Sequence, residues 1–174
     1  MLPLPFQRKV KHRDQRVAVL IDVQNMYHSA KHLYKARVNF YEVLREATAE
    51  RKLIRAIAYV VTSETEEERS FFEALVHQGI ELRSKELQVF YGGLKKADWD
   101  VGITLDAVNL AQSVDVIVLV SGDGDFVPLV EYLQNRGKIV EILAFAKSAS
   151  SRLREKANNF IDLGSDRRRF LLRK

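Results

Sequence analysis

The chain has 174 residues, of which 47% are hydrophobic and 29% charged, a combination typical of one compact globular domain with a buried core. It contains no cysteine, which excludes a disulfide framework, thiol catalysis and cysteine-ligated zinc. The formal net charge of +5 favours a polyanionic partner such as a nucleic acid.

The positive charge gathers toward the two ends of the chain. We expect a basic N-terminal extension over residues 1–15 and a basic C-terminal tail over residues 165–174, around a single domain of residues 16–164. Clustered lysine and arginine residues displace counterions from phosphates, so these ends either bind nucleic acid or are simply solvated, and both interpretations stay open. The N-terminus lacks the apolar stretch of a signal peptide, and no apolar run is long enough to span a membrane, which predicts a cytoplasmic protein without membrane contact.

Strand and helix patterns alternate along the chain. In order, they predict a strand at 17–21, a helix at 26–35, a helix at 40–50 capped by Asn39, a strand at 54–61, and a helix that opens at 62–65 and runs to about 78. They continue with a half-exposed strand at 80–89, a flexible basic loop at 91–96, a helix at 97–112, the most hydrophobic strand at 116–120, a helix at 126–135, a strand at 139–144, a short helix from 148 and a short strand at 160–163. This alternation predicts an α/β fold, a Rossmann-like three-layer sandwich with a mostly parallel central sheet.

Acidic residues follow the carboxyl ends of these predicted strands. Asp22 directly follows the first strand, and Asp123 and Asp125 follow the strand at 116–120, while Asp100 lies near the start of a helix. Ligands of open parallel sheets bind beyond the carboxyl ends of the strands. Turn formation or helix capping explains any one of these aspartates alone. If Asp22, Asp100 and Asp123, which come from three different segments, converge, their mutual repulsion requires compensation, and a divalent cation with carboxylate ligands supplies it.

The helix at 97–112 carries acidic residues on different faces. Asp100 and Asp106 fall on different stripes of this helix, so Asp106 is either solvated or a secondary contributor to the site. Asp98 competes with Asp100 for the role of ligand at the helix start. The stripe expected to face the core consists of Val101, Leu105 and Val108.

Three motifs, in this order and spacing, resemble the NYN domain family, which includes the LabA-like proteins and shares the PIN-like nuclease fold. They are Asp22-Val23-Gln24-Asn25 after a hydrophobic strand, Asp100 with Asp106 six residues later on a helix, and Ser121-Gly122-Asp123-Gly124-Asp125-Phe126. The resemblance covers nearly the whole chain. It implies a PIN-like domain and a ribonuclease that hydrolyses RNA phosphodiester bonds with a metal-activated water.

The resemblance also implies roles for single residues. Asp22, Asp100 and Asp123 would be the catalytic aspartates that bind Mg²⁺ or Mn²⁺, and Asp125 would be an additional catalytic acidic group. Asn25 would support Asp22 or touch the RNA. The other supporting or substrate-binding positions are Ser121, Lys96 and Asp106.

The sequence leaves open the roles of two aromatic residues and the choice between catalysis and binding. Trp99 and Tyr91 either stack on unpaired bases or pack within the protein. The main competing function is an RNA-binding or protein-interaction module with little or no catalysis on the same fold. A homodimer through the exposed strand around residues 82–89 is also compatible with the sequence. A dinucleotide-binding enzyme is disfavoured, because Asp22-Val23-Gln24-Asn25 is not a glycine-rich turn.

Overall fold

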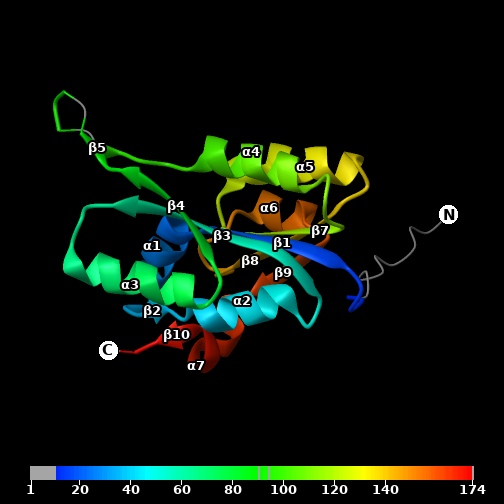
Figure 1. Cartoon of the computed structure of the whole chain (residues 1–174), viewed down its shortest axis with the longest axis horizontal. Helices are drawn as coiled ribbons and strands as arrows, with labels where there is room; N and C mark the ends of the chain where they lie inside the picture. Colours follow the sequence, from blue (N-terminus) through cyan, green and yellow to red (C-terminus); the bar gives the residue numbers. More distant parts are fainter. Residues whose placement is uncertain (1–10, 90, 94, 174) are drawn as a thin grey trace.

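A six-stranded sheet forms the centre of the molecule, and helices cover both of its faces (Figure 1). The computed structural model describes residues 11–89, 91–93 and 95–173. The strand order is β4-β3-β1-β7-β8-β9, and every neighbouring pair is parallel, which confirms the predicted Rossmann-like three-layer class. The strands are β1 (Arg16–Asp22), β3 (Lys52–Thr62), β4 (Glu81–Glu86), β7 (Val116–Val120), β8 (Ile139–Ala144) and β9 (Asn159–Asp162).

The alternation of side chains along β1 explains why both faces of the sheet are buried. Val17, Val19 and Ile21 belong to one hydrophobic core, and Ala18 and Leu20 belong to the other. Helices α1, α2, α3 and α7 cover the first core, and α4, α5 and α6 cover the second (Figure 1). The helices are α1 (Val23–Tyr34), α2 (Phe40–Thr48), α3 (Glu66–His77), α4 (Asp100–Leu110), α5 (Val127–Asn135), α6 (Ser151–Lys156), α7 (Arg167–Phe170) and the short 3₁₀ helices η1 (Gly124–Phe126) and η2 (Leu163–Asp166).

The ends of the predicted elements differ from the observed ones where caps decide them. Strands β7 and β8 have the predicted bounds, and Asn39 caps α2 as expected. Helix α1 begins three residues earlier than predicted, because Asp22 caps it directly and its carboxylate accepts the Asn25 N–H at 3.2 Å. The motif after β1 is therefore the cap and first turn of a helix.

The predicted strand at 80–89 and the predicted loop at 91–96 are both corrected. The strand is divided into β4 at the sheet edge and β5 (Gln88–Val89), which pairs antiparallel with β6 (Lys95–Lys96). The end of the predicted loop is thus the second strand of a small hairpin. Residues 90 and 94 lie outside the described part of the chain.

The core-facing stripe of α4 was predicted incorrectly. Val101 and Leu105 are 70% and 60% exposed, and the buried residues are Ile103, Ala107 and Leu110. Both stripes have apolar residues at i, i+4 and i+7, so the spacing alone does not select between them. The helix is apolar on most sides, and packing against the sheet decides which stripe is buried.

The predicted basic C-terminal tail folds onto the domain up to residue 172. Strand β10 (Leu171–Leu172) pairs with β2 (Arg37–Val38), and Phe170 and Leu171 are buried. Within α7, Arg169 forms ion pairs with Glu42 and Glu46 at 2.6 and 2.7 Å. The arginine-rich segment is therefore partly structural.

Only the last part of the predicted N-terminal extension is described. Residues 1–10 lie outside the described chain, whereas Arg13 pairs with Glu50 at 3.0 Å and Asp14 with Lys52 at 3.2 Å. Both pairs lie at the amino edge of the sheet, and both are exposed. Among the described residues, no helix combines the length and the apolar character that crossing a membrane requires.

Candidate metal centre

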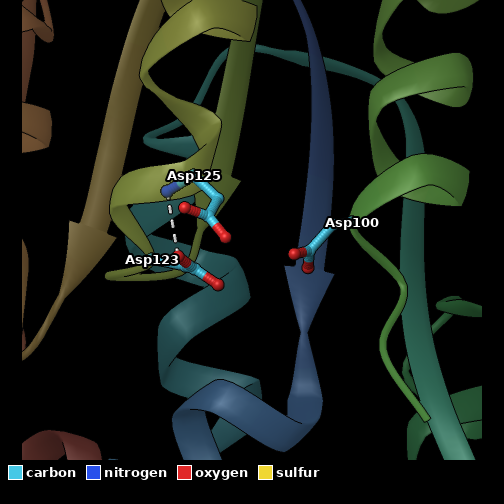
Figure 2. Close-up of side chains that lie close together, drawn as sticks. All are labelled: Asp100, Asp123 and Asp125. Carbon is cyan, nitrogen blue, oxygen red and sulfur yellow. Dashed lines mark hydrogen bonds between the residues drawn. The ribbon is translucent and has the colours of Figure 1, made fainter. Parts of the chain in front are cut away.

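Three carboxylates converge beyond the carboxyl ends of β1 and β7. One oxygen from each of Asp100, Asp123 and Asp125 lies within 4.8 Å of the other two. Figure 2 shows Asp123 and Asp125 on the turn that follows β7 and Asp100 facing them from the start of α4. Asp125 is exposed, whereas Asp100 and Asp123 are half-buried. Of the three aspartates considered together in the sequence, Asp100 and Asp123 come together here, and Asp125 takes the place of Asp22 in the group.

The turn after β7 holds Asp123 and Asp125 through a local cap. The Asp123 carboxylate accepts the Asp125 N–H at 2.9 Å and so caps η1. A Cβ on Gly122 would lie 3.0 Å from the Cα of Ala149, and one on Gly124 would lie 2.8 Å from the Ser150 Oγ. The loop after β8 therefore approaches the turn so closely that a side chain at either glycine would force its neighbour to shift.

Asp22 is buried beside this group and is held by two hydrogen bonds. It accepts one from the Ser121 hydroxyl at 3.0 Å and one from the Asn25 backbone at 3.2 Å. Burial raises the pKa of Asp22, and the charges of Asp123 and Asp98 raise it further, while the two hydrogen bonds act in the opposite direction. Asp22 is not one of the three converging carboxylates, but it is electrostatically coupled to them.

Asp100 shows the strongest effect of this crowding. Burial raises the pKa of Asp100 to about 6, with further contributions from the charges of Asp123, Asp98, Asp22 and Asp125. In the described part of the chain, no lysine or arginine forms an ion pair with Asp22, Asp100, Asp123 or Asp125. The negative charge of the centre therefore has no described cationic partner.

The donor set and its spacing are suitable for one hard divalent cation. Carboxylate oxygens bind Mg²⁺ at about 2.0–2.1 Å and larger divalent cations at up to about 2.6 Å, so ligands on opposite sides of one ion are roughly 4–5 Å apart. The separation of up to 4.8 Å among Asp100, Asp123 and Asp125 falls in this range. Asp98 is exposed and lies outside the converging group, so the geometry favours Asp100 over Asp98 as a ligand.

Two of the predicted supporting residues belong to the centre, and one does not. The Asn25 side-chain oxygen accepts the Gly122 N–H at 3.0 Å, and Ser121 joins Asp22 to the Asp123 backbone. These bonds tie the start of α1 to the turn after β7. Asp106 instead accepts a hydrogen bond from Tyr59 and pairs with Arg83, both at 2.8 Å. It lies outside the converging group. The fourth predicted position, Lys96, lies in β6, and its side chain is outside the described part of the structure.

The packing interpretation of Trp99 agrees with the structure. Its indole N–H donates to the carbonyl oxygen of Val60 at 2.9 Å, and its ring packs on Tyr59 with centroids 5.3 Å apart. Lys85 places its ammonium 4.3 Å from the centroid of the Trp99 ring. The start of α4, and with it Asp100, is thereby anchored to β3. The sequence left packing of Trp99 open without naming its partners, and Gly102 fits this packing, since a Cβ there would lie 2.6 Å from the indole.

Comparisons with known proteins agree with this architecture. A family model of the NYN domain matches residues 16–164. The chain is 30% identical to the Low amplitude and bright protein LabA of Synechococcus elongatus over 165 residues, which cover 89% of this chain and 87% of the relative. It is also similar to the crystal structure of a protein of unknown function from Vibrio parahaemolyticus, with a TM-score of 0.85, 36% identity, and 94% of this chain and 99% of the other covered. The chain therefore belongs to the NYN domain family.

Proposed function

We propose that the protein is a metal-dependent ribonuclease that hydrolyses phosphodiester bonds of RNA at the carboxyl edge of its sheet. The observation that carries this proposal is the convergence of Asp100, Asp123 and Asp125 without a described cationic partner. The NYN family is nuclease-like and includes RNA-binding members, which supports the same reaction and substrate class.

The geometry of the centre supports a division of roles among its residues. Asp100, Asp123 and Asp125 would hold a divalent cation such as Mg²⁺ or Mn²⁺, with Asp22 next to them. A divalent cation bound there would lower the pKa of a water molecule and offset negative charge on the phosphate oxygens. Asn25 and Ser121 would position the turn that carries Asp123 through hydrogen bonds to its backbone, and the Ser121 hydroxyl would also hold Asp22.

The fixed positions of these carboxylates are themselves important for hydrolysis. The Asp22 carboxylate is held on both oxygens, and the Trp99 anchor restrains the helix start that carries Asp100. A pre-organised set of charges requires little rearrangement when substrate binds, which favours catalysis over simple ion binding. Asp125 is the exposed member of the group and therefore the one most open to substrate and solvent.

The second candidate function is an RNA-binding module without turnover. Two of the crowded aspartates, Asp22 and Asp123, cap helices, and helix capping alone is a sufficient reason for their presence. In that case the crowding is incidental, and RNA would bind without being cleaved.

The test compares cleavage of labelled single-stranded and hairpin RNA by the wild type and by Asp123→Asn, with Mg²⁺ or Mn²⁺ and with a chelator. Asparagine keeps the shape and the capping oxygen but removes the charge. We expect the wild type to cleave only with metal and the variant to bind RNA without cleaving it. Asp14→Asn removes one carboxylate at the opposite edge of the sheet and should cleave like the wild type. Equal cleavage by Asp123→Asn would refute the metal centre, and RNA binding without any cleavage by the wild type would favour the binding module.

A further inference from the structure

A second charged surface lies where the end of α1, β2, α7 and the end of the described chain meet. Strand β10 pairs with β2 so that Leu172 lies opposite Arg37, and Arg167 lies over the ring of Tyr34 at 5.2 Å. These contacts bring segments from distant parts of the sequence together. Five exposed cations lie on these adjoining segments, and we call them the α7 basic face: Lys35, Arg37, Arg167, Arg168 and Arg173.

The positive charge of the α7 basic face is not neutralised by the protein. Among the described residues, none of its five cations forms an ion pair with a carboxylate. By contrast, Arg169 in the same helical turn is paired with both Glu42 and Glu46. Asp166 is an acid in the same segment, and its carboxylate accepts the Arg169 N–H at 3.2 Å at the start of α7. The paired arginine holds α7 in place, and the unpaired cations are left for an external anion.

The α7 basic face and the metal centre lie toward opposite ends of one helix. Helix α1 begins directly after Asp22 and ends at Tyr34, whose ring contacts Arg167. Its 12 residues correspond to a length of about 18 Å. A nucleic-acid strand with one phosphate at the carboxylates therefore needs only a short flanking segment to reach these cations.

We propose that the α7 basic face binds phosphates of the RNA strand that flanks the scissile bond. This inference rests on the proposed function and adds a second contact to it. Arginine and lysine side chains at phosphates release counterions and add affinity without reading the sequence. The face thus positions substrate and takes no part in the bond cleavage.

An RNA strand fits the α7 basic face better than a lipid surface does. Membrane-surface elements combine basic residues with large apolar side chains that enter the bilayer. On this face the exposed large apolar side chain is Leu172, at 44% exposure, and Phe170 and Leu171 beside it are buried in the core. The face therefore offers charge with little apolar area.

The test measures the binding of a labelled single-stranded RNA to Asp123→Asn as the parent, so that no cleavage interferes. Arg37, Arg168 and Arg173 are changed together to glutamine, and Arg167 is kept because it packs on Tyr34. We expect RNA affinity to fall about tenfold or more, and the slope of log affinity against log salt to become shallower by about 2, since each lost phosphate contact on a single strand accounts for about 0.7. In the cleaving protein, the same triple change should raise KM for long RNA and leave kcat unchanged.

The matched control removes three exposed cations at the amino edge of the sheet, Arg13, Lys52 and Arg136, and should bind RNA like the parent. If the parent binds RNA and the triple glutamine variant binds it with the same affinity and salt slope, the α7 basic face is not a phosphate site. If the parent binds no RNA, the proposed function fails together with this inference. A variant that loses binding to vesicles of anionic phospholipid but keeps RNA binding would assign the face to membranes and overturn the proposal. Circular dichroism melting curves check that each variant is folded.

Discussion

The carboxylate of Glu141 and the carboxylates at the carboxyl edge of the sheet differ in whether the protein supplies a cationic partner. Glu141 in β8 is bonded to Arg51, with both side chains 1% exposed and the closest N–O distance 2.8 Å. Its other oxygen accepts hydrogen bonds from Arg51 and from Asn159. At the carboxyl edge, Asp22 and Asp100 are shielded from water without such a partner among the described residues.

The difference lies in what compensates the negative charge of each carboxylate. A buried charge is tolerated when a partner and hydrogen bonds replace its water. Arg51 meets this condition, because it also donates to the carbonyl oxygens of Ala47 and Thr48. The aspartates of the candidate metal centre have no such cationic partner among the described residues, and a divalent cation is one way in which their repulsion could be relieved. The following changes break one group and leave the other intact.

The largest effect on the free energy of unfolding is expected when the buried Arg51–Glu141 pair loses one of its charges. Glu141→Gln leaves the Arg51 charge buried without its counter-charge, and we expect the free energy of unfolding to fall by about 3–5 kcal/mol. Urea denaturation followed by circular dichroism measures this change. The double change Arg51→Met with Glu141→Leu removes both charges and should recover most of the loss. A single variant as stable as the wild type would mean that the pair is not buried in solution.

The next largest effect is expected for Asp100→Asn. This change should stabilise the protein, whereas Glu141→Gln should destabilise it. In the presence of a chelator at neutral pH, the free energy of unfolding should rise, because one of several repelling charges is removed. RNA cleavage with metal should fall by about 100-fold, which corresponds to about 2.7 kcal/mol of transition-state stabilisation. Asp106→Asn is the matched control on the same helix, and because Asp106 pairs with Arg83, its loss should cost stability and leave metal affinity unchanged. Lower stability of the chelated Asp100→Asn protein would contradict the crowding argument.

A smaller effect is expected when pH changes the free energy of unfolding through the Asp100 carboxyl. The pKa of Asp100 is raised from 3.8 to about 6 in the folded protein, so between these values the folded state binds a proton that the unfolded state has lost. The stabilising contribution is complete below pH 3.8 and disappears as the pH rises through about 6. Unfolding free energies of the chelated protein from pH 4 to 7 should therefore fall more steeply in the wild type than in Asp100→Asn. Metal affinity should rise over the same window, since protons compete for the carboxylate.

If the unfolding free energies of the wild type and of Asp100→Asn changed in parallel from pH 4 to 7, this prediction would be contradicted. Isothermal titration with Mg²⁺ or Mn²⁺ at the two ends of the window provides the second readout. Glu141→Gln serves as the reference, because the Arg51–Glu141 pair lies outside the converging carboxylates and its loss should leave the pH dependence of metal affinity unchanged.

Much of the fold was predictable because it depends on local patterns. Apolar runs define β7 and β8 to the residue, and Asn39 marks the start of α2. The position of Asp22 and Asp123 at one edge follows from the parallel sheet that these runs predict. The family motifs add Asp100 from a third segment, and the structure brings it to Asp123 and Asp125.

Several of the features that were missed depend on contacts between residues far apart in the sequence. Arg51 and Glu141 are 90 positions apart, and nothing in either local pattern indicates the pair, although a glutamate within an apolar strand is a signal in hindsight. Arg169 was assigned to a tail that either binds nucleic acid or is solvated, because its partners, Glu42 and Glu46, lie on a helix more than 120 positions earlier. The buried face of α4 was likewise decided by packing, since two apolar stripes of equal spacing compete.

The smallest effect on the free energy of unfolding is expected at Asp115, whose carboxylate is paired with Arg16 but exposed. Asp115 accepts hydrogen bonds from the side chain and the backbone of Arg16, and these bonds lower its pKa to about 2. The two side chains are 50% and 41% exposed, so water and salt screen the pair, and Asp115→Asn should cost at most about 1 kcal/mol. Because the folded pKa is lowered, the contribution is present above the unfolded value and is lost as the pH falls toward 2. Urea denaturation at low and high salt measures it, and the difference between wild type and variant should shrink with salt. A loss as large as that in Glu141→Gln would mean that pairing alone, and not burial, sets the cost of an unpaired charge in this protein.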